Sequence, residues 1–386
     1  MFTDRLKNYI KSVDWFLLVP VFIIVLAGIV TMGSFSANDG SNSTLSTDVF
    51  FNRQLIWLLV SVCVFFIASF IDWSFLKNTT VIVILFSLSV LVLLLLFAYG
   101  SVVNGARSWF NFGAFSFQPT DFAKLAVILI LSKYFSRRHI EIANVRHILV
   151  SAFYVSIVFF LIILQPDLGS AVIISLLWLG MVLVSGISKK HLVAVVLIAV
   201  LFFGGLWSFA FKPYQKERIK TFISPLTDIR GSGYNAYQSM IAVGSGGFLG
   251  KGVGYGTQSR LRFLPEYRTD FIFAAFAEEW GFVGVMLLFI LYGLMFWRVL
   301  KISFRGGSNF EMLFGLGLAM FFLSHVGINV GMNIGLLPVT GVTLPFMSYG
   351  GSHLLAEFLG LGMLAGMSRY FRAVHKGTAS NEMVGV

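Results

Sequence analysis

The sequence predicts an all-α integral membrane protein, and three observations carry this prediction. The chain of 386 residues is 57% hydrophobic and only 12% charged, with a mean hydropathy of +0.86. Such a composition is far more apolar than that of a soluble domain. Apolar runs of about 20 residues, the length that spans a bilayer, recur along the chain. No soluble domain and no internal repeat is visible, so we expect a single polytopic membrane domain over residues 1–386.

About ten transmembrane helices are expected. The first apolar run follows Arg5, Lys7 and Lys11, as in a signal peptide, but a Ser/Asn-rich loop and a second apolar run follow it without a convincing cleavage site. We therefore interpret it as a retained helix. The expected helices cover residues 16–34, 54–71, 79–98, 121–136, 148–164, 169–187, 191–211, 271–297, 311–334 and 352–370.

The short loops indicate an orientation. If the helices alternate in direction, the basic residues of these loops fall on the side of the N-terminus, which the positive-inside rule places in the cytoplasm. Both termini are then expected to be cytoplasmic. The residues are Lys77, Lys133, Arg137, Arg138, Arg146, Lys189, Lys190, Arg298, Lys301, Arg305, Arg369, Arg372 and Lys376.

A large external loop, residues 212–269, is expected between the seventh and eighth helices. It is rich in glycine, as in "GSGGFLGKG", which lacks the spacing of a nucleotide-binding loop. Two interpretations stay open: its cations are solvated charges, or they hold a phosphate-bearing ligand at the membrane surface. These cations are Lys212, Lys216, Arg218, Lys220, Arg230, Lys251, Arg260, Arg262 and Arg268. The stretch "YQKERIKTF" predicts a short amphipathic helix lying on the membrane.

Charged side chains inside the apolar helices are costly and therefore informative. Asp121 and Lys124 are three residues apart, on one helix face, where they can pair with each other or serve a site. Asp167 follows a proline in a short turn and is expected to cap the next helix. His325 and Glu357 each stand alone in an apolar run and are ambiguous. Cys63 lies within a predicted span and indicates core packing only.

Residues 335–351 interrupt the external ends of the last two helices. Two prolines and four glycines fall in this range, so it cannot be continuous helix. Its backbone polar groups must then be buried in protein or face water. We expect a broken external loop that forms the wall of a cavity.

The motifs of the chain resemble those of the SEDS family (shape, elongation, division and sporulation) from residue 14 to 370, and within it the RodA branch more than the FtsW branch. They include "FQPTDFAK", "QPDLGSA", "GSGYNAYQS", "GTQSRLRFLPE", "TDFIFAAFAEEWGFVG", "NIGLLPVTGV" and "LPFMSYGGS". The chain has Arg268 where the family usually has histidine and Asp121 where it usually has glutamate.

This resemblance implies a peptidoglycan glycosyltransferase that polymerises lipid II, the undecaprenyl-pyrophosphate-linked disaccharide pentapeptide, during cell elongation. It implies a class B penicillin-binding protein as partner and a multi-pass position in the bacterial cytoplasmic membrane, with the active site facing outward. The essential acid of the family corresponds to Asp270, and its intramembrane acid and lysine to Asp121 and Lys124. Besides membrane lipid, no further partner is implied, and no nucleic acid is expected.

The chemistry assigns roles to these residues. An α-linked donor that gives a β-1,4 product requires inversion, hence a base for the attacking hydroxyl and a cation for the leaving pyrophosphate. We expect Asp270 to be the base and Arg218 to hold the pyrophosphate; Lys124, Asp121, Gln258, Glu266, Ser348 and Tyr349 are further expected substrate-binding residues. Glu278 and Glu279 would point away from Asp270 on a regular helix and are assigned to packing. No protein-only metal site is visible; a divalent cation would need the substrate phosphates.

Two other function classes stay open: a lipid II flippase and a non-catalytic scaffold for the penicillin-binding protein. A flippase should carry polar groups at the middle of the membrane and at both faces. The polar motifs here gather on the expected external side. The sequence therefore favours the enzyme.

Overall fold

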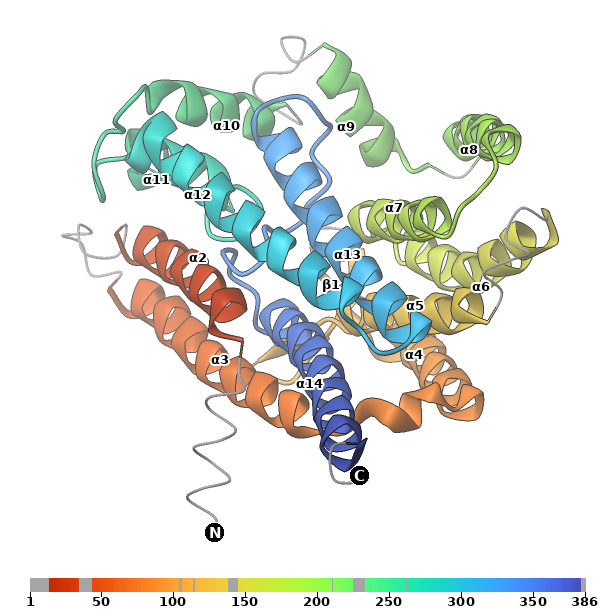
Figure 1. Ribbon diagram of the computed structural model, residues 1–386. Helices are drawn as coiled ribbons and strands as arrows, with labels where there is room; N and C mark the ends of the chain where they lie inside the picture. The colour runs from red at the N-terminus through yellow and green to blue at the C-terminus, as the bar shows by residue number, and fades with distance from the viewer. Residues whose placement is uncertain are drawn as a thin grey trace.

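The computed structural model describes residues 14–34, 44–103, 106–113, 115–137, 145–209, 211–224, 233–261, 263–264 and 266–382, and shows a helical bundle (Figure 1). Within these residues each of the ten predicted segments is helical. The corresponding helices are α2 (Trp15–Ser34), α3 (Thr44–Phe70), α4 (Thr79–Tyr99), α5 (Pro119–Ser136), α6 (Val145–Leu164), α7 (Leu168–Val184), α8 (Lys189–Phe209), α12 (Ile272–Phe304), α13 (Asn309–Asn333) and α14 (Gly351–Glu382).

The chain is a multi-pass membrane protein. Seven helices among the described residues are long and apolar enough to cross a membrane: α2, the part Phe50–Phe70 of α3, α4, α6, α8, α12 and α13. Helix α7 is apolar but only 17 residues long. Helices α5 and α14 carry buried charges, which lower their hydropathy.

Helix α13 lies at the centre of the bundle (Figure 1), and most of its side chains are buried. It packs against α12, α5 and α7, while α14 packs along α3. Such close contact depends on small residues: a Cβ at Gly317 would lie 2.7 Å from a side-chain carbon of Ile128 on α5. Helix α8 lies at the edge of the bundle (Figure 1). None of its residues is buried, and many of its apolar side chains are exposed.

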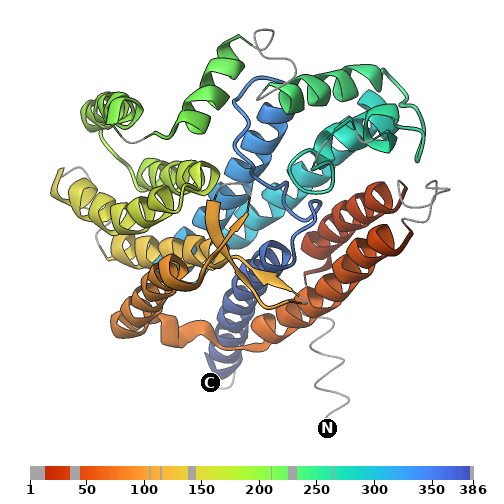
Figure 2. The same cartoon turned by 180° about the vertical axis from the view of Figure 1, so that it is seen from behind.

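A small antiparallel sheet joins α4 to α5, which an all-α prediction does not include. Its strands are β1 (Ser101–Val103), β2 (Ala106–Asn111) and β3 (Ser116–Phe117), in the order β1-β2-β3. Ser101 pairs with Trp109, and Phe110 pairs with Phe117. The segment is rich in aromatic and β-branched residues, which favour strands, but the strands are too short to give a clear alternation. The sheet crosses the bundle in front of the helices in Figure 2.

Where the structure describes it, the long loop between α8 and α12 contains three further helices: α9 (Pro213–Ile223), α10 (Tyr234–Ser245) and α11 (Thr257–Arg260). Helix α9 confirms the short helix predicted from "YQKERIKTF". Helix α10 packs on α12 and touches α13. A 3-10 helix, η1 (Trp73–Lys77), connects α3 to α4. Residues 225–232, which include the predicted cation Arg230, lie outside the described part of the chain.

Helix α12 covers the predicted segment 271–297 but is interrupted at Gly281, a break that the sequence did not predict. Gly281 has φ 64° and ψ −167°, a conformation open essentially to glycine alone. The glycine-rich turn at 246–252 fills the gap. The backbone N–H groups of Lys251 and Gly252 donate to the carbonyls of Glu278 and Glu279 at 3.0 Å, and Phe282 donates to Gly247 at 2.9 Å. The backbone groups freed by the break are therefore satisfied within the protein, as an apolar environment requires.

Candidate active site

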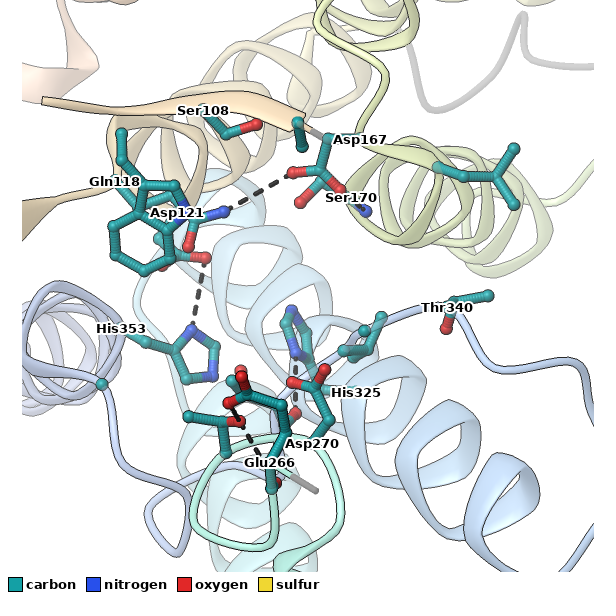
Figure 3. A pocket seen from close by; sticks show the side chains of 18 of the residues that line it. Ser108, Gln118, Asp121, Asp167, Ser170, Glu266, Asp270, His325, Thr340 and His353 are labelled. Carbon is teal, nitrogen blue, oxygen red and sulfur yellow. Dashed lines mark hydrogen bonds and ion pairs between the residues drawn. The ribbon is translucent and has the colours of Figure 1, made fainter. Parts of the chain in front are cut away.

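A cavity of about 260 Å³ lies where the sheet, the broken loop and the ends of several helices meet (Figure 3). Side chains from β2, α5, α7, α9, α13 and α14 line it, together with the turn before α12. The polar and charged lining residues are Ser108, Trp109, Gln118, Asp121, Lys124, Asp167, Ser170, Arg218, Glu266, Thr269, Asp270, His325, Thr340, Thr343, Tyr349 and His353.

Asp270 stands two residues before α12, and α13 fixes its backbone. The side-chain amides of Asn329 and Asn333 donate to the Asp270 carbonyl at 2.9 and 3.1 Å. The half-buried carboxylate faces Gly341, where an added Cβ would lie 3.4 Å from its Oδ2. Gly341 has φ +74°, which favours glycine. The broken loop thus passes close to the carboxylate and leaves room for it.

The cavity raises the pKa of Asp270 to about 7. Burial of the carboxylate is the main cause, because a charged group loses hydration there. The negative charges of Glu266 and Asp167 act in the same direction, whereas the cation of Arg218 opposes them. A carboxylate with a pKa near neutrality can take a proton from a hydroxyl and release it again at physiological pH.

The opposite wall carries a cluster of buried ionisable side chains. Lys124 Nζ lies 2.9 Å from Asp121 Oδ1, so the predicted pair is confirmed. Lys124 also lies 3.4 Å from His325 Nε2. The ring of His353 lies between Asp121, at 3.2 Å, and Glu357, at 2.9 Å. Both residues that were ambiguous in the sequence, His325 and Glu357, therefore belong to one cluster.

The end of the broken loop braces the turn that carries Asp270. Ser348 Oγ donates to the Thr269 carbonyl at 2.6 Å and accepts from the Leu344 N–H at 2.8 Å. The backbone N–H of Tyr349 donates to the Arg268 carbonyl at 2.8 Å. Tyr349 also lines the cavity, whereas Ser348 lies just behind its wall. Both residues expected from the "SYGGS" motif are thus close to Asp270, one as lining and one as support.

Two further acids face the cavity. Glu266 has φ +50° and accepts from the Thr269 hydroxyl at 3.0 Å. Asp167 caps α7 as predicted, since its Oδ1 accepts from the Ser170 N–H at 3.0 Å. Its other oxygen lies 3.5 Å from Gln118 Nε2 (Figure 3). Asp167 therefore combines a structural role with a place in the wall.

Gln258 lies apart from the cavity. Its backbone N–H donates to both carboxylate oxygens of Glu278, at 3.1 and 3.2 Å. Glu278 is fully buried and also binds Lys251 Nζ at 2.8 Å. Glu279 accepts from the Gly254 N–H at 2.7 Å. These two acids order the glycine-rich loop, in agreement with their assignment to packing.

The cations of the external loop differ in their surroundings. Arg218 lines the cavity from α9. Lys251 is engaged with Glu278, and the exposed Lys220 lies 3.0 Å from Glu217 on the same helix. Among the described cations of this loop, Arg218 is the one placed to meet a ligand in the cavity. Arg262 lies outside the described residues.

Sequence reasoning missed several residues of the site. His353, Asn329 and Asn333 are buried and contact the key acids. Asn333 begins the motif "NIGLLPVTGV", but none of the three was assigned a role from the sequence. A signal did exist: His353 and Glu357, like Asn329 and Asn333, are spaced four apart in apolar helices, which places each pair on one helix face. Across the described residues, no group of three histidine, cysteine or carboxylate side chains is placed to hold a metal ion.

Comparison with known proteins decides the family. The family of cell cycle proteins that includes FtsW, RodA and SpoVE matches residues 14–373. The chain belongs to this family. Stage V sporulation protein E of Bacillus subtilis is 36% identical over 364 residues, covering 94% of this chain and 98% of that protein. The peptidoglycan glycosyltransferase MrdB of Escherichia coli K12 is 39% identical over 295 residues, covering 76% of this chain and 79% of its own.

Solved structures agree with this assignment. A chain of a peptidoglycan synthase complex, described for its coordination of polymerization and crosslinking, has a TM-score of 0.79 to this structure at 33% identity. The match covers 93% of this chain and 98% of the other. The fold described above is therefore that of the SEDS family.

Proposed function

We propose that this chain is a peptidoglycan glycosyltransferase that polymerises lipid II into β-1,4 glycan strands by an inverting mechanism. Relatives named as peptidoglycan glycosyltransferases support the enzyme class. One observation carries the mechanism: the Asp270 carboxylate, with a pKa of about 7, shares a cavity with the cations Arg218 and Lys124. A base and a phosphate-binding cation are the two groups that this reaction requires.

The reaction has one displacement at the anomeric carbon. The 4-hydroxyl oxygen of one sugar attacks C1 of another, and the bond from C1 to the pyrophosphate oxygen breaks with its electron pair on the phosphate. Asp270 takes the hydroxyl proton. Arg218 offers paired N–H donors to the leaving phosphate oxygens, which a lysine cannot match in geometry. Lys124 is already bound to Asp121, so we assign it a smaller share of the phosphate charge.

We assign substrate-binding roles to residues that line the cavity or support its lining. Asp121, Glu266 and Tyr349 line the cavity and can meet hydroxyl or amide groups of the disaccharide. Ser348 acts indirectly, by holding the Thr269 carbonyl beside Asp270. Gln258 stays a predicted substrate-binding residue. It lies beside the glycine-rich loop, where its backbone N–H donates to Glu278.

The position in the cell is part of the proposal. Ten membrane crossings would place both termini in the cytoplasm and the cavity on the outer face, where lipid II is presented. Residues 1–13, with the basic residues of the N-terminus, lie outside the described part of the chain, as does Arg138. A class B penicillin-binding protein as partner is supported by the likeness to a synthase complex with coupled crosslinking. We assign the chain to elongation, as a RodA, on its motifs and on its likeness to a solved structure of the rod shape determining protein RodA of Thermus thermophilus.

The flippase alternative is less well supported. Asp121 and Lys124 lie in the first turns of α5, and His353 and Glu357 in the first two turns of α14. His325 and Asn329 lie in the last turns of α13. All of these ends meet at the cavity, so these six polar groups gather at one end of the bundle. A flippase needs polar groups along the whole crossing.

Incubation of the purified chain with labelled lipid II tests the proposal. We expect glycan ladders on a gel without added polymerase, and longer ones when a class B penicillin-binding protein is present. Movement of lipid II across vesicles without ladders would favour the flippase. If glycan ladders appeared only after a separate polymerase was added, the result would favour the scaffold.

A further inference from the structure

A chain of ion pairs runs from the cavity into the bundle and passes through His353. Lys124 contacts Asp121 at 2.9 Å, Asp121 contacts His353 Nδ1 at 3.2 Å, and His353 Nε2 contacts Glu357 at 2.9 Å. Figure 3 shows the step from Asp121 to His353. The four side chains come from two helices, α5 and α14.

These four groups are almost fully removed from solvent. The exposed fractions are 2% for Asp121 and Lys124, 5% for His353 and 0% for Glu357. A buried charge without a partner is strongly destabilising, so charges in such a place must balance one another. The protonation of the two histidines of the site therefore matters, and their contacts determine it.

The contacts assign the protons. The ring nitrogens of His353 lie 3.2 Å and 2.9 Å from carboxylate oxygens, within ion-pairing distance, and only a ring that carries both protons has an N–H at each of these contacts. His325 differs. Its Nε2 faces the Lys124 ammonium, which can only donate, and its Nδ1 lies 3.3 Å from the Thr343 carbonyl, which can only accept. His325 is therefore neutral, although the two rings lie 4.8 Å apart.

The resulting charges are balanced: the carboxylates of Asp121 and Glu357 against the cations of Lys124 and His353. No other Asp, Glu, Lys or Arg among the described residues forms an ion pair with these four. Removal of the His353 charge would leave one buried negative charge in excess. Removal of a carboxylate at the same time would restore neutrality.

Glu357 connects this chain to the turn that carries Asp270. Its second oxygen accepts from the Phe346 N–H at 2.9 Å, where the broken loop adopts a φ of +61°. Two residues later, Ser348 holds the Thr269 carbonyl, next to Asp270. One wall of the cavity, with Asp121, is thus tied through His353 and Glu357 to the loop that supports the other wall.

We propose that His353 is a positioning residue: its imidazolium bridges Asp121 and Glu357 and so fixes the Asp121 wall relative to the loop that supports Asp270. It does not touch the reacting atoms. The catalytic part of this inference rests on the proposed glycosyltransferase function, whereas the bridge itself does not.

The test compares His353→Gln with the double variant His353→Gln/Glu357→Gln. Glutamine keeps a donor, and the amide oxygen introduced at 357 still accepts from the Phe346 N–H. We expect His353→Gln to lower kcat for lipid II by up to about 10²-fold with KM changed only a few-fold, because a misplaced reacting group affects the transition state more than binding. We expect it also to lower the unfolding temperature, and the double variant to recover most of that loss.

His147→Gln is the matched control. This histidine is 2% exposed, lies on α6 and contacts the Tyr134 hydroxyl at 2.9 Å, away from the cavity. We expect its kcat to equal that of the wild type, so a general effect of losing a buried histidine can be separated from the effect at His353. Equal kcat for His353→Gln and the wild type, or no recovery in the double variant, would overturn the proposal.

Nitrogen-15 NMR of histidine-labelled wild-type protein in nanodiscs tests the bridge without activity. With the signal assigned through its loss in His353→Gln, both ring nitrogens of His353 should be protonated at neutral pH. A neutral ring would contradict the inference. If the wild type produced no glycan from lipid II, the proposed function would fail. The NMR signal of His353 and the recovered unfolding temperature of the double variant would still decide whether His353 forms the bridge.

Discussion

Asp270 occupies the boundary between a half-buried turn and an apolar helix, and this position controls its titration. Its folded-state pKa of about 7 lies above the usual 3.8. The folded protein therefore binds this proton more tightly than the unfolded chain, so stability is lost as pH rises from 3.8 through about 7. We expect kcat/KM for lipid II to rise with pH up to about 7 and then to level off, because the base must be ionised.

Thermal unfolding over the same pH range provides the second readout. Asp270→Asn removes the titration, so its unfolding temperature should fall less than that of the wild type between pH 5 and 8. Parallel curves for both proteins, together with a rate that does not change around pH 7, would show that Asp270 titrates normally.

Arg218 offers a residue-level test of the leaving group. Arg218→Lys keeps the charge on α9 but loses the planar fork, so we expect lipid II turnover to fall several-fold, and Arg218→Ala to fall further. Lys220→Ala is the control. Lys220 lies two residues along the same helix, 3.0 Å from Glu217, and its loss should leave lipid II turnover at the wild-type rate. Normal turnover of both Arg218 variants across salt concentrations would reduce Arg218 to a surface charge.

Residue spacing predicted contacts within one helix but not those between helices. Asp121 and Lys124 are three apart, so their pairing is visible in the sequence. The partner of Asp121 on the other side, His353, is distant in the chain and comes to it only through the packing of α14 against α5. Gln258 shows the converse: a place in a family motif did not indicate that its backbone binds Glu278.

At the scale of elements, the break in α12 joins the glycine-rich loop to the helix that begins beside Asp270. A Cβ at Gly281 would overlap the backbone nitrogen of Gly250, and the backbone there suits glycine only. We expect Gly281→Ala to destabilise the protein by at least about 1–3 kcal/mol, the usual cost of such backbone strain. Thermal unfolding in detergent measures the effect.

Gly293→Ala provides the control within the same helix. A Cβ there meets nothing within 4 Å, and alanine is favoured over glycine in a helix by about 1 kcal/mol, so this variant should be neutral or slightly more stable. Equal unfolding temperatures for both variants would mean that the junction at Gly281 contributes nothing to stability.

Length and apolarity sufficed to locate the helices, because a segment of about 20 apolar residues has no other stable form in lipid. The small sheet at 101–117 and the break at Gly281 were not visible, since both depend on contacts with distant segments. Helix α9 was predicted from the amphipathic pattern of "YQKERIKTF". The turn at 246–252 was recognised only as rich in glycine, and its contact with α12 was not predicted.

For the whole molecule, the orientation in the membrane remains a prediction that labelling can test. In a Cys63→Ser background, Leu249→Cys lies on the exposed glycine-rich loop and Phe304→Cys at the opposite end of α12. A membrane-impermeant maleimide added to intact cells should label the first variant only, and both after permeabilisation. Labelling of Phe304→Cys in intact cells would reverse the orientation and place the cavity inside.

The single membrane domain over residues 1–386 likewise stays a prediction. Within the described residues, the cavity draws on segments from β2 to α14, so its walls are spread over most of the chain. Loss of any one of these segments is therefore expected to abolish the site. The proposed function is therefore expected to depend on the packed bundle as a unit.

The rate of lipid II polymerisation by purified Asp270→Asn, relative to the wild type, tests the central claim most directly. The variant keeps the size of the side chain and the backbone contacts with Asn329 and Asn333, so membrane insertion and unfolding temperature should be retained. If Asp270 removes the hydroxyl proton, the rate should fall by roughly 10²–10⁴-fold, or about 3–5 kcal/mol. Polymerisation by the folded variant at a rate near that of the wild type would contradict the account.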